Sequence, residues 1–320
     1  MILVTTAFLV FYGFRDKIGK LFDDRQQYNK FSTDVLDQDR IKRQLEVFYR
    51  AIDSDFTPPS EWLSVKHDQT YYLPNKNIIF TGIPKVGCSN WKEQLLEAEG
   101  ALKKPIQQEK VKSVHGPATK FRMSHFDRYD GQYDERIRNA TSILILRNPW
   151  VRAVSGFRQK LSSEKTQGGS YPKMGLKVVK DQRNISDDVQ SGELFPTFKE
   201  FLTYSVARGG IGDVHFKPQH KFIFPDRVRY DYVIPLEEAG PMSRVLFEKL
   251  ELKGNSDLFG SYDHQSDPRL QSSVLKAKEW LTEMEPELVN KFYELYKYDF
   301  MLLNYTTFSD PDFPMPRYNT

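Results

Sequence analysis

Residues 82–91 combine small, hydroxyl and cationic side chains in an order suited to binding a phosphate or sulfate group. They follow the apolar run 77–81 and have the sequence Gly82-Ile-Pro-Lys-Val-Gly-Cys-Ser-Asn-Trp91. Glycines let a backbone approach an anion closely, Ser89 and Asn90 can donate hydrogen bonds, and Lys85 adds a positive charge. A helix that follows such a loop adds unpaired N–H groups and the positive end of its dipole. The segment therefore predicts an anion site, although it lacks the G-x-x-x-x-G-K-[ST] pattern of a Walker A loop.

A second segment, Arg147-Asn-Pro-Trp-Val-Arg-Ala-Val-Ser155-Gly-Phe-Arg158, follows the apolar run 142–146. Arg147 offers a planar fork for a phosphate, and Ser155, eight residues later, can donate a hydrogen bond to the same group. Standing alone, the segment would favour a basic helix whose charges are merely solvated. The two segments together predict a site for a ligand with anionic groups at both ends.

Both segments require a strand, a loop and a helix in that order. Two such units predict an α/β fold with a doubly wound parallel sheet, whose ligands bind at the carboxyl ends of the strands. The expected strands are 77–81, 142–146 and 230–234, and the expected helices are 41–52, 91–99, 150–161, 241–250 and 286–303.

The stretch 162–191 is rich in Ser, Gly, Lys and Asp, and predicts a long surface loop, which in a compact domain is often functional or disordered. Its cations could hold an anionic polysaccharide, and a solvated loop is an equal alternative. These cations are Lys165, Lys173, Lys177, Lys180 and Arg183.

The first segment resembles the 5′-phosphosulfate-binding loop of sulfotransferases that use 3′-phosphoadenylyl sulfate (PAPS). The form P-K-V-G-[CS]-[ST]-[NS]-W occurs in the Golgi group of chondroitin/dermatan 4-O-, N-acetylgalactosamine (GalNAc) 4-O- and glucuronyl 3-O-sulfotransferases. The second segment resembles that group's 3′-phosphate-binding segment, R-[DE]-P-[FW]-x-R-x-x-S-x-[FY]-R. Asn148 replaces the usual acidic residue, and we expect the turn to survive because Asn caps helices well.

The resemblance covers about residues 75–305 and implies the P-loop-like sulfotransferase fold. It extends to His215-Phe-Lys-Pro-Gln-His220 and to Tyr230-Asp-Tyr-Val233, which are similar to H-W-x-P-[QYV] and Y-D-x-[VI] in that group. Phe216 replaces the Trp, and the cysteines that follow it in the group are absent here, which puts the rigidity of this loop in question. The donor-binding residues implied by the resemblance are Pro84, Lys85, Val86, Gly87, Cys88, Ser89, Asn90, Trp91, Arg147 and Ser155.

The implied reaction is the in-line transfer of a sulfonate from PAPS to a sugar hydroxyl, with the 4-OH of GalNAc in chondroitin/dermatan or a related glycan as the expected acceptor. Lys85 would neutralise charge on the leaving phosphate. A general base is also needed, and we assign it to His125, with His115 and His215 as open alternatives among six histidines. An inactive glycan-binding protein is the main alternative function. A kinase or NTPase is disfavoured by the missing Walker motifs.

The composition limits the possible partners. The 320 residues carry a formal net charge of only +3, so no nucleic-acid partner is indicated. No H-x-x-H, H-E-x-x-H or C-x-x-C spacing occurs, so no metal site is expected.

The N-terminus predicts a membrane segment. Residues 1–14 are uncharged and nearly all apolar but shorter than the ~20 residues of a spanning helix, so we expect a signal-anchor that has lost a few N-terminal residues. A cleaved signal peptide and a buried segment are the alternatives. A polar stem, 15–40, would then hold a lumenal domain, 41–320, at the Golgi membrane as a single-pass type II protein. The sequons at Asn139, Asn184 and Asn304 agree with this location, whereas the single cysteine, which excludes an internal disulfide, is unusual for it.

Overall fold

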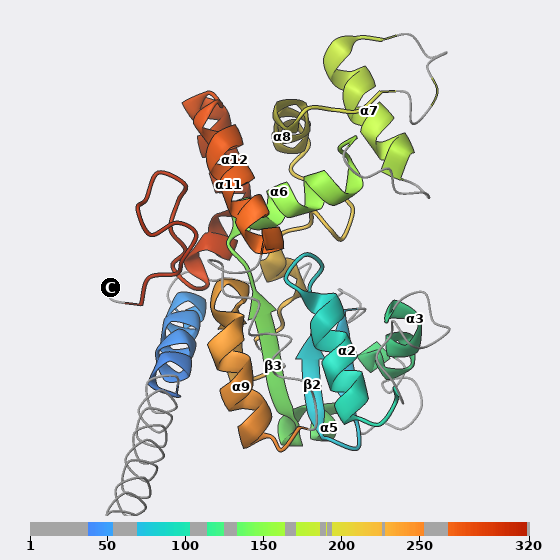
Figure 1. Ribbon diagram of the computed structural model, residues 1–320, viewed down its shortest axis with the longest axis vertical. Coiled ribbons are helices and arrows are strands. Elements are labelled where there is room, and N and C mark those ends of the chain that lie inside the picture. The colour runs from blue at the N-terminus through green and yellow to red at the C-terminus, as the bar shows by residue number, and fades with distance from the viewer. Residues whose placement is uncertain are drawn as a thin grey trace, which may run out of the picture.

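The chain folds into a small sheet with helices on its face and a further layer of helices beyond the ends of its strands. Figure 1 shows this arrangement in the computed structural model. The structure describes residues 38–53, 69–102, 114–124, 133–163, 171–185, 190, 194–225, 228–252 and 268–318. The expected membrane anchor (1–14), nearly all of the expected stem, Lys165 and His125 lie outside these residues.

Four buried strands form one sheet in the order β1-β2-β3-β4. They are β1 (Thr70–Leu73), β2 (Ile78–Thr81), β3 (Thr141–Leu146) and β4 (Tyr232–Pro235). Strands β2, β3 and β4 are parallel, and β1 pairs antiparallel with β2 as an edge strand. The predicted α/β class is confirmed, with three of the strands within about two residues of their expected positions. The antiparallel strand β1 was not predicted.

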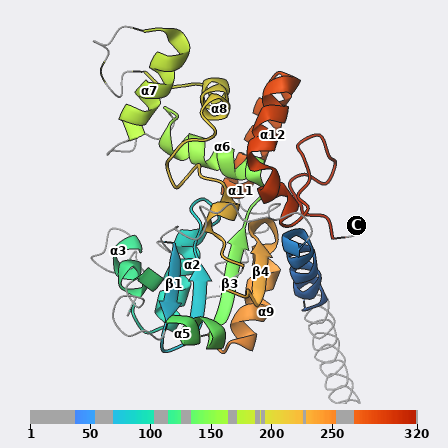
Figure 2. The same ribbon diagram turned by 180° about the vertical axis from the view of Figure 1, so that it is seen from behind.

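Helices α2 (Cys88–Ala98) and α9 (Ala239–Lys249) cover one face of the sheet, in front of the strands in Figure 1 and behind them in Figure 2. The Trp91 and Phe247 rings join these helices, with their centroids 6.0 Å apart. A helix at 38–53 also packs against the domain, because Phe48 makes an edge contact with Tyr230 at 6.0 Å. The described part of this helix includes residues 38–40, the last three of the expected stem.

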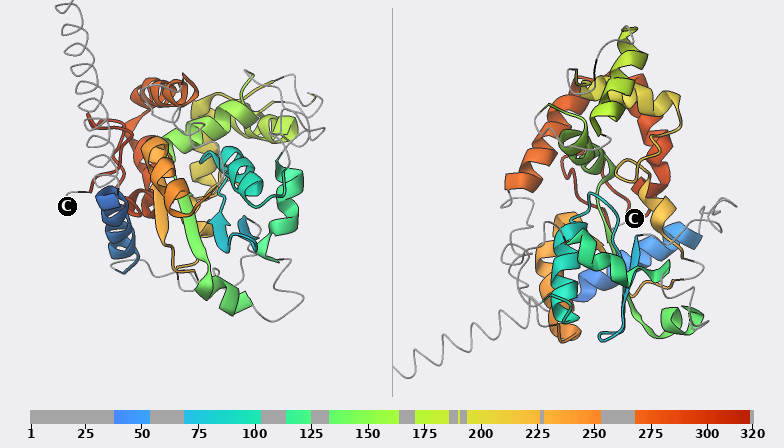
Figure 3. Two further views of the ribbon diagram at one scale, coloured as in Figure 1. Left: turned by 60° about the horizontal axis from the view of Figure 1, so that its bottom comes forward. Right: turned by 90° about the vertical axis from the view of Figure 1, so that its right-hand side faces the viewer.

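A second helical layer lies beyond the carboxyl ends of the strands, and the side view in Figure 3 shows it above the sheet. It contains α6 (Pro149–Lys160), α8 (Phe198–Ala207), α11 (Pro268–Thr282) and α12 (Pro286–Met301). Aromatic rings hold it together: Trp150 stacks on Phe292 at 4.4 Å, and Phe157 meets Trp280 edge-on at 5.7 Å. Because α6 starts directly after β3, this helical layer covers the end of the sheet where ligands are expected.

The prediction of a continuous surface loop over 162–191 was wrong. Helix α7 (Tyr171–Arg183) occupies the middle of this stretch and packs against α8. Its inner face is formed by Gly175, Val178 and Val179, all of them buried. The three lysines of the helix, Lys173, Lys177 and Lys180, dilute the apolar pattern and hide the helical period.

The remaining described elements are short segments around the sheet. They are α3 (His115–Ala118), η3 (Thr119–Phe121), α5 (Tyr133–Asn139), η4 (Gln219–Phe222) and η5 (Leu236–Glu238). Among the helices in these described ranges, none is both long and apolar enough to cross a membrane.

The start of α6 is fixed by Asn148, as the sequence predicted for an N-cap residue. The fully buried Asn148 accepts a hydrogen bond from Trp150 N at 3.1 Å through Oδ1. Its Nδ2 donates to the carbonyl oxygens of Thr306 and Pro314 at 3.0 and 3.1 Å. These two bonds attach the segment that follows α12 to the start of α6. Only an amide side chain can make them while still capping the helix.

We expect Asn148→Asp to destabilise the fold by about 3 kcal/mol, because two buried carbonyls would lose their donors and face a carboxylate instead. The Glu237 carboxylate accepts from Asn148 N at 3.0 Å and would add repulsion. Urea unfolding of both proteins measures the difference. Asn148→Ser keeps a capping oxygen and should lose less stability. An Asp variant as stable as the wild type would contradict this account of Asn148.

Candidate functional site

The loop between β2 and α2 is turned by two residues with left-handed backbone conformations. Lys85 has φ +74° and Gly87, which is the N-cap of α2, has φ +76°. A lysine in this conformation is strained because its Cβ crowds the backbone. The backbone carbonyl of Lys85 accepts a hydrogen bond from Arg147 Nη1 at 3.1 Å, so the two predicted anion-binding segments are joined directly.

Helix α2 begins at Cys88, three residues earlier than expected, so Ser89 and Asn90 belong to its first turn. Gly87 provides no side-chain cap, which is typical of a helix N-terminus whose N–H groups serve a ligand. Gly82 has a different role from the one predicted for it. A Cβ at Gly82 would lie 2.8 Å from Phe80 Cε1 and 3.0 Å from Lys92 Cε, so packing, not access for an anion, requires this glycine.

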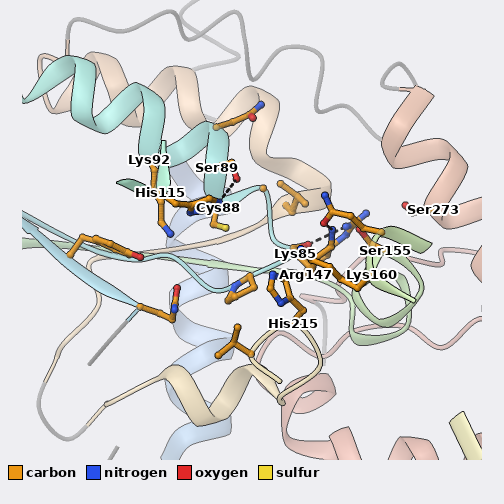
Figure 4. Close-up of a pocket in the computed structure, with 18 of the residues that line it drawn as sticks. Lys85, Cys88, Ser89, Lys92, His115, Arg147, Ser155, Lys160, His215 and Ser273 are labelled. Atoms are coloured by element: carbon orange, nitrogen blue, oxygen red, sulfur yellow. Dashed lines mark hydrogen bonds between the residues drawn. The ribbon is translucent and has the colours of Figure 1, made fainter. Parts of the chain in front are cut away.

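A cavity of about 580 Å³ lies where the carboxyl ends of β2 and β3 meet α2, α6 and the turn 213–217 (Figure 4). The cationic residues that line it are Lys85, Lys92, Arg122, Arg147 and Lys160, and the histidines are His115 and His215. Within the part of the chain that the structure describes, no Asp or Glu lines it. A lining of this kind selects an anionic ligand.

Most of the donor-binding residues predicted from the sequence meet in this cavity. Those that line it are Pro84, Lys85, Gly87, Cys88, Ser89, Asn90, Arg147 and Ser155. Val86 and Trp91 do not line it, because both are buried in the core and hold the loop from behind. Trp91 stacks on Phe80 at 6.3 Å, which ties the start of α2 to β2.

Lys85 is held across the cavity by α6. Its Nζ donates to Gln159 Oε1 at 2.6 Å, and Gln159 lies one turn after Ser155 on the same helix face. Burial and the nearby Arg147 guanidinium lower the pKa of Lys85 to about 7. A bound anion would raise the pKa of Lys85 again, because negative charge favours the ammonium form.

Gln219 positions Arg147, and the sequence did not identify it. Its Oε1 accepts from Arg147 N at 3.0 Å, and its Nε2 donates to Arg147 O at 2.7 Å. Both residues are buried, so this pair of hydrogen bonds fixes the backbone at the end of β3. Gln219 lies in the His215–His220 segment, whose Pro-Gln pair matched the family pattern, although the pattern alone gave no role to the amide.

The sequence also did not identify the structural role of Arg152, because the one role considered for its charge was exposure to solvent on a basic helix. Arg152 is fully buried, donates through Nε to Pro84 O at 3.0 Å and through Nη2 to Val214 O at 3.4 Å. One guanidinium therefore ties the anion-binding loop to the turn that forms the opposite wall of the cavity. The apolar neighbours of Arg152 on α6 were the available indication that it points inward.

His215 is oriented by a carboxylate and a phenol. Its Nδ1 lies 2.7 Å from Asp213 Oδ1 and 3.1 Å from the Tyr171 hydroxyl, and its backbone N–H donates to the same carboxylate oxygen at 2.8 Å. Burial raises the pKa of Asp213, but the hydrogen bonds from His215 outweigh it and leave the pKa lowered. A Cβ at Gly156 would lie 3.3 Å from His215 O, so only glycine lets α6 approach this turn so closely.

His115 lies on the other side of the cavity in Figure 4, beside Ser89 and Lys92. Its Nε2 is 3.4 Å from Ser89 Oγ. Burial lowers the pKa of His115, and the Lys92 charge lowers it further. His115 and His215, the two alternatives for the base, thus both line the cavity, whereas His125 lies outside the described residues.

The donor set of the cavity fits a nucleotide with two anionic ends and does not suggest a metal. Among the described residues, no group of three or more His, Cys, Asp or Glu is placed to hold a metal ion.

Comparison with known proteins agrees with the cavity's chemistry. The model of the sulfotransferase family matches residues 68–306, which include every element that lines the cavity. Human carbohydrate sulfotransferase 9 is 29% identical over 247 residues, covering 74% of this chain and 53% of that protein. Carbohydrate sulfotransferase 12 of Xenopus laevis is 24% identical over 311 residues, or 86% of this chain and 71% of that protein. Mouse carbohydrate sulfotransferase 8 is 25% identical over 277 residues, covering 85% and 64%.

The chain thus spans between about half and 71% of the length of these relatives. No solved structure gives a significant match. The family match covers most of the chain and coincides with the cationic cavity at the ends of the strands. The chain therefore belongs to the sulfotransferase family, and the relatives that it resembles are carbohydrate sulfotransferases.

Proposed function

We propose that this protein transfers a sulfonate group from PAPS to a hydroxyl of a glycan. The main observation behind this proposal is the cavity, in which the two anion-binding segments meet and which five cations and two histidines line. The family implies PAPS as the donor, and its two phosphate-bearing ends match the two segments. A purely glycan-binding role would leave the strained Lys85 and its lowered pKa without a purpose.

The donor would be held at both of its charged ends by this chain's own residues. The backbone N–H groups at the start of α2, together with Ser89 and Lys85, would hold the 5′ end. Arg147 and Ser155 would hold the 3′-phosphate. The donor supplies a sulfonate on a phosphate leaving group, and Lys85 would neutralise the charge that develops on the departing oxygen.

We assign the general base to His215. Because Asp213 holds Nδ1–H, Nε2 is left as the proton acceptor, and the carboxylate would stabilise the imidazolium that forms. Figure 4 places His215 on the same side of the cavity as Lys85. His115 is the weaker candidate, since a neighbouring lysine disfavours its protonated form. The sequence-based assignment to His125 stays a prediction.

The acceptor and the location belong to the same proposal. The 4-OH of GalNAc in chondroitin/dermatan is the acceptor favoured by the sequence motifs. Residues 1–14 would anchor the protein in the Golgi membrane with its catalytic domain in the lumen. The exposed Asn139 and Asn184 are accessible to the glycosylation that this location permits.

Binding of 3′-phosphoadenosine 5′-phosphate, measured by calorimetry, tests the donor site. We expect the wild type to bind it at least about 100-fold more tightly than adenosine 5′-phosphate, because the 3′-phosphate gains charge-assisted hydrogen bonds from Arg147 and Ser155. Arg147→Ala should remove most of that preference. Arg244→Ala, at an exposed position of α9, is the matched control and should keep it. Equal affinity of the wild type for both nucleotides would refute the assignment of this site.

A further inference from the structure

A second cavity, of about 550 Å³, opens between α7, α8 and the turn that follows α8. Among the residues that line it are Lys173 and Lys177 of α7, Tyr204 and Arg208 at α8, and Gly212 and Asp213 of the turn. None of the predicted donor-binding residues lines this cavity. Sulfonate transfer as described so far gives this second cavity no role.

One short strip of backbone, residues 212–215, contributes lining residues to both cavities. Asp213 lines the second cavity, while the adjacent Val214 and His215 line the first. Tyr171, at the start of α7, contacts His215 Nδ1 at 3.1 Å, so α7 is also attached to the strip from the other side. A chain-like ligand with one hydroxyl at His215 would reach the second cavity by passing Val214.

The charge of the second cavity favours an anionic ligand. Lys173 and Lys177 are exposed and lie one turn apart on the same face of α7. Arg208 joins them over the Tyr204 ring, at 4.6 Å from its centroid, and also pairs with Asp181. Among the described residues, Asp213 is the one carboxylate that lines this cavity, and it already forms a hydrogen bond with His215.

The shape of the strip favours a sugar chain. A Cβ at Gly212 would meet no atom within 4 Å, so the backbone there is open to a ligand. Val214 is one of two large apolar side chains that are exposed in the described residues, at 38%. An exposed valine beside the catalytic histidine can pack against the apolar face of a sugar ring, while the cations hold acidic groups on neighbouring sugars.

We propose that the second cavity binds uronate or sulfate groups of a polysaccharide whose neighbouring sugar is the acceptor. The acceptor is then an anionic polymer, not a neutral terminal sugar. This inference rests on the proposed function for the position of the reacting hydroxyl, but the binding of the polymer stands independently of turnover.

Two variants test the inference, with a fluorescent desulfated chondroitin oligosaccharide as the probe. In Lys173→Glu/Lys177→Glu we expect binding about tenfold weaker at low salt, because each exposed ion pair is worth up to about fivefold in affinity. Gly212→Leu fills the strip without backbone strain and should weaken binding to a similar degree at any salt concentration. Lys291→Glu/Lys297→Glu, at exposed positions of α12 outside both cavities, is the matched control and should bind like the wild type.

Transfer assays add a second readout. With desulfated chondroitin as acceptor, Lys173→Glu/Lys177→Glu and Gly212→Leu should each raise KM and leave kcat near that of the wild type. With p-nitrophenyl N-acetyl-β-galactosaminide, a short neutral acceptor, their KM should not change. Unaltered binding of the oligosaccharide by both variants would overturn the inference. A wild type that binds the oligosaccharide through this cavity but transfers nothing to any acceptor would refute the proposed function and leave the inference standing.

Discussion

Lys85→Met should lower kcat for sulfonate transfer by about 10²- to 10³-fold, the usual loss when a group that stabilises developing negative charge is removed. Met has a similar length and apolar stem but no charge, so the loop can keep its packing. Lys85 lies within the cavity, is held by Gln159, and has its backbone fixed by Arg147. A steady-state assay with saturating PAPS measures kcat, and Lys291→Met serves as the control.

The same residue should make nucleotide binding depend on pH. With a pKa of about 7, lowered by burial and by Arg147, Lys85 carries its charge in the free protein only below neutral pH. An anion favours the charged form, so above pH 7 binding must take up a proton, and affinity should fall by up to about tenfold per pH unit. Lys85→Met should flatten this dependence between pH 7 and 9. An unchanged kcat together with an unchanged pH slope would show that Lys85 does not face the ligand.

His215→Ala should lower kcat by about 10²- to 10⁴-fold, the range for a lost general base, while the affinity for 3′-phosphoadenosine 5′-phosphate stays within a few fold. Asp213→Asn should give a smaller loss of kcat, because the histidine would lose the carboxylate that orients its ring.

His115→Ala is the comparison that separates the candidates. Since His115 lies beside Ser89, its removal should act mainly on the affinity for the nucleotide. If His115→Ala abolishes turnover with nucleotide affinity intact and His215→Ala does not, the base is His115. If neither variant affects kcat, the assignment returns to His125.

The meeting of the two anion-binding segments at one cavity could be predicted from the sequence because the residues of each segment are local in the chain. Lys85, Gly87 and Ser89 lie within eight positions after the end of one strand, and Arg147 and Ser155 lie within nine positions after the end of another. In a parallel sheet the ends of adjacent strands meet at one edge, so two short motifs suffice to place one ligand. The structure confirms this juxtaposition through the hydrogen bond between Arg147 and the Lys85 carbonyl.

The supporting residues could not be predicted, because their partners are distant in sequence. Arg152 acts on Pro84, 68 residues away, and Gln219 acts on Arg147, 72 residues away. Motif matching also assigned ligand contact to Val86 and Trp91, which serve the core. A motif records which residue types occur together and does not separate the side chains that face a ligand from those that position the loop.

Sulfonate transfer is tested by incubating the protein with radiolabelled PAPS and desulfated chondroitin, desulfated dermatan or glycoprotein acceptors. We expect label on an acceptor with the wild-type protein, and almost none with Lys85→Met or His215→Ala. Absence of label on every acceptor, from a folded protein that binds 3′-phosphoadenosine 5′-phosphate, would contradict sulfonate transfer and favour a glycan-binding protein.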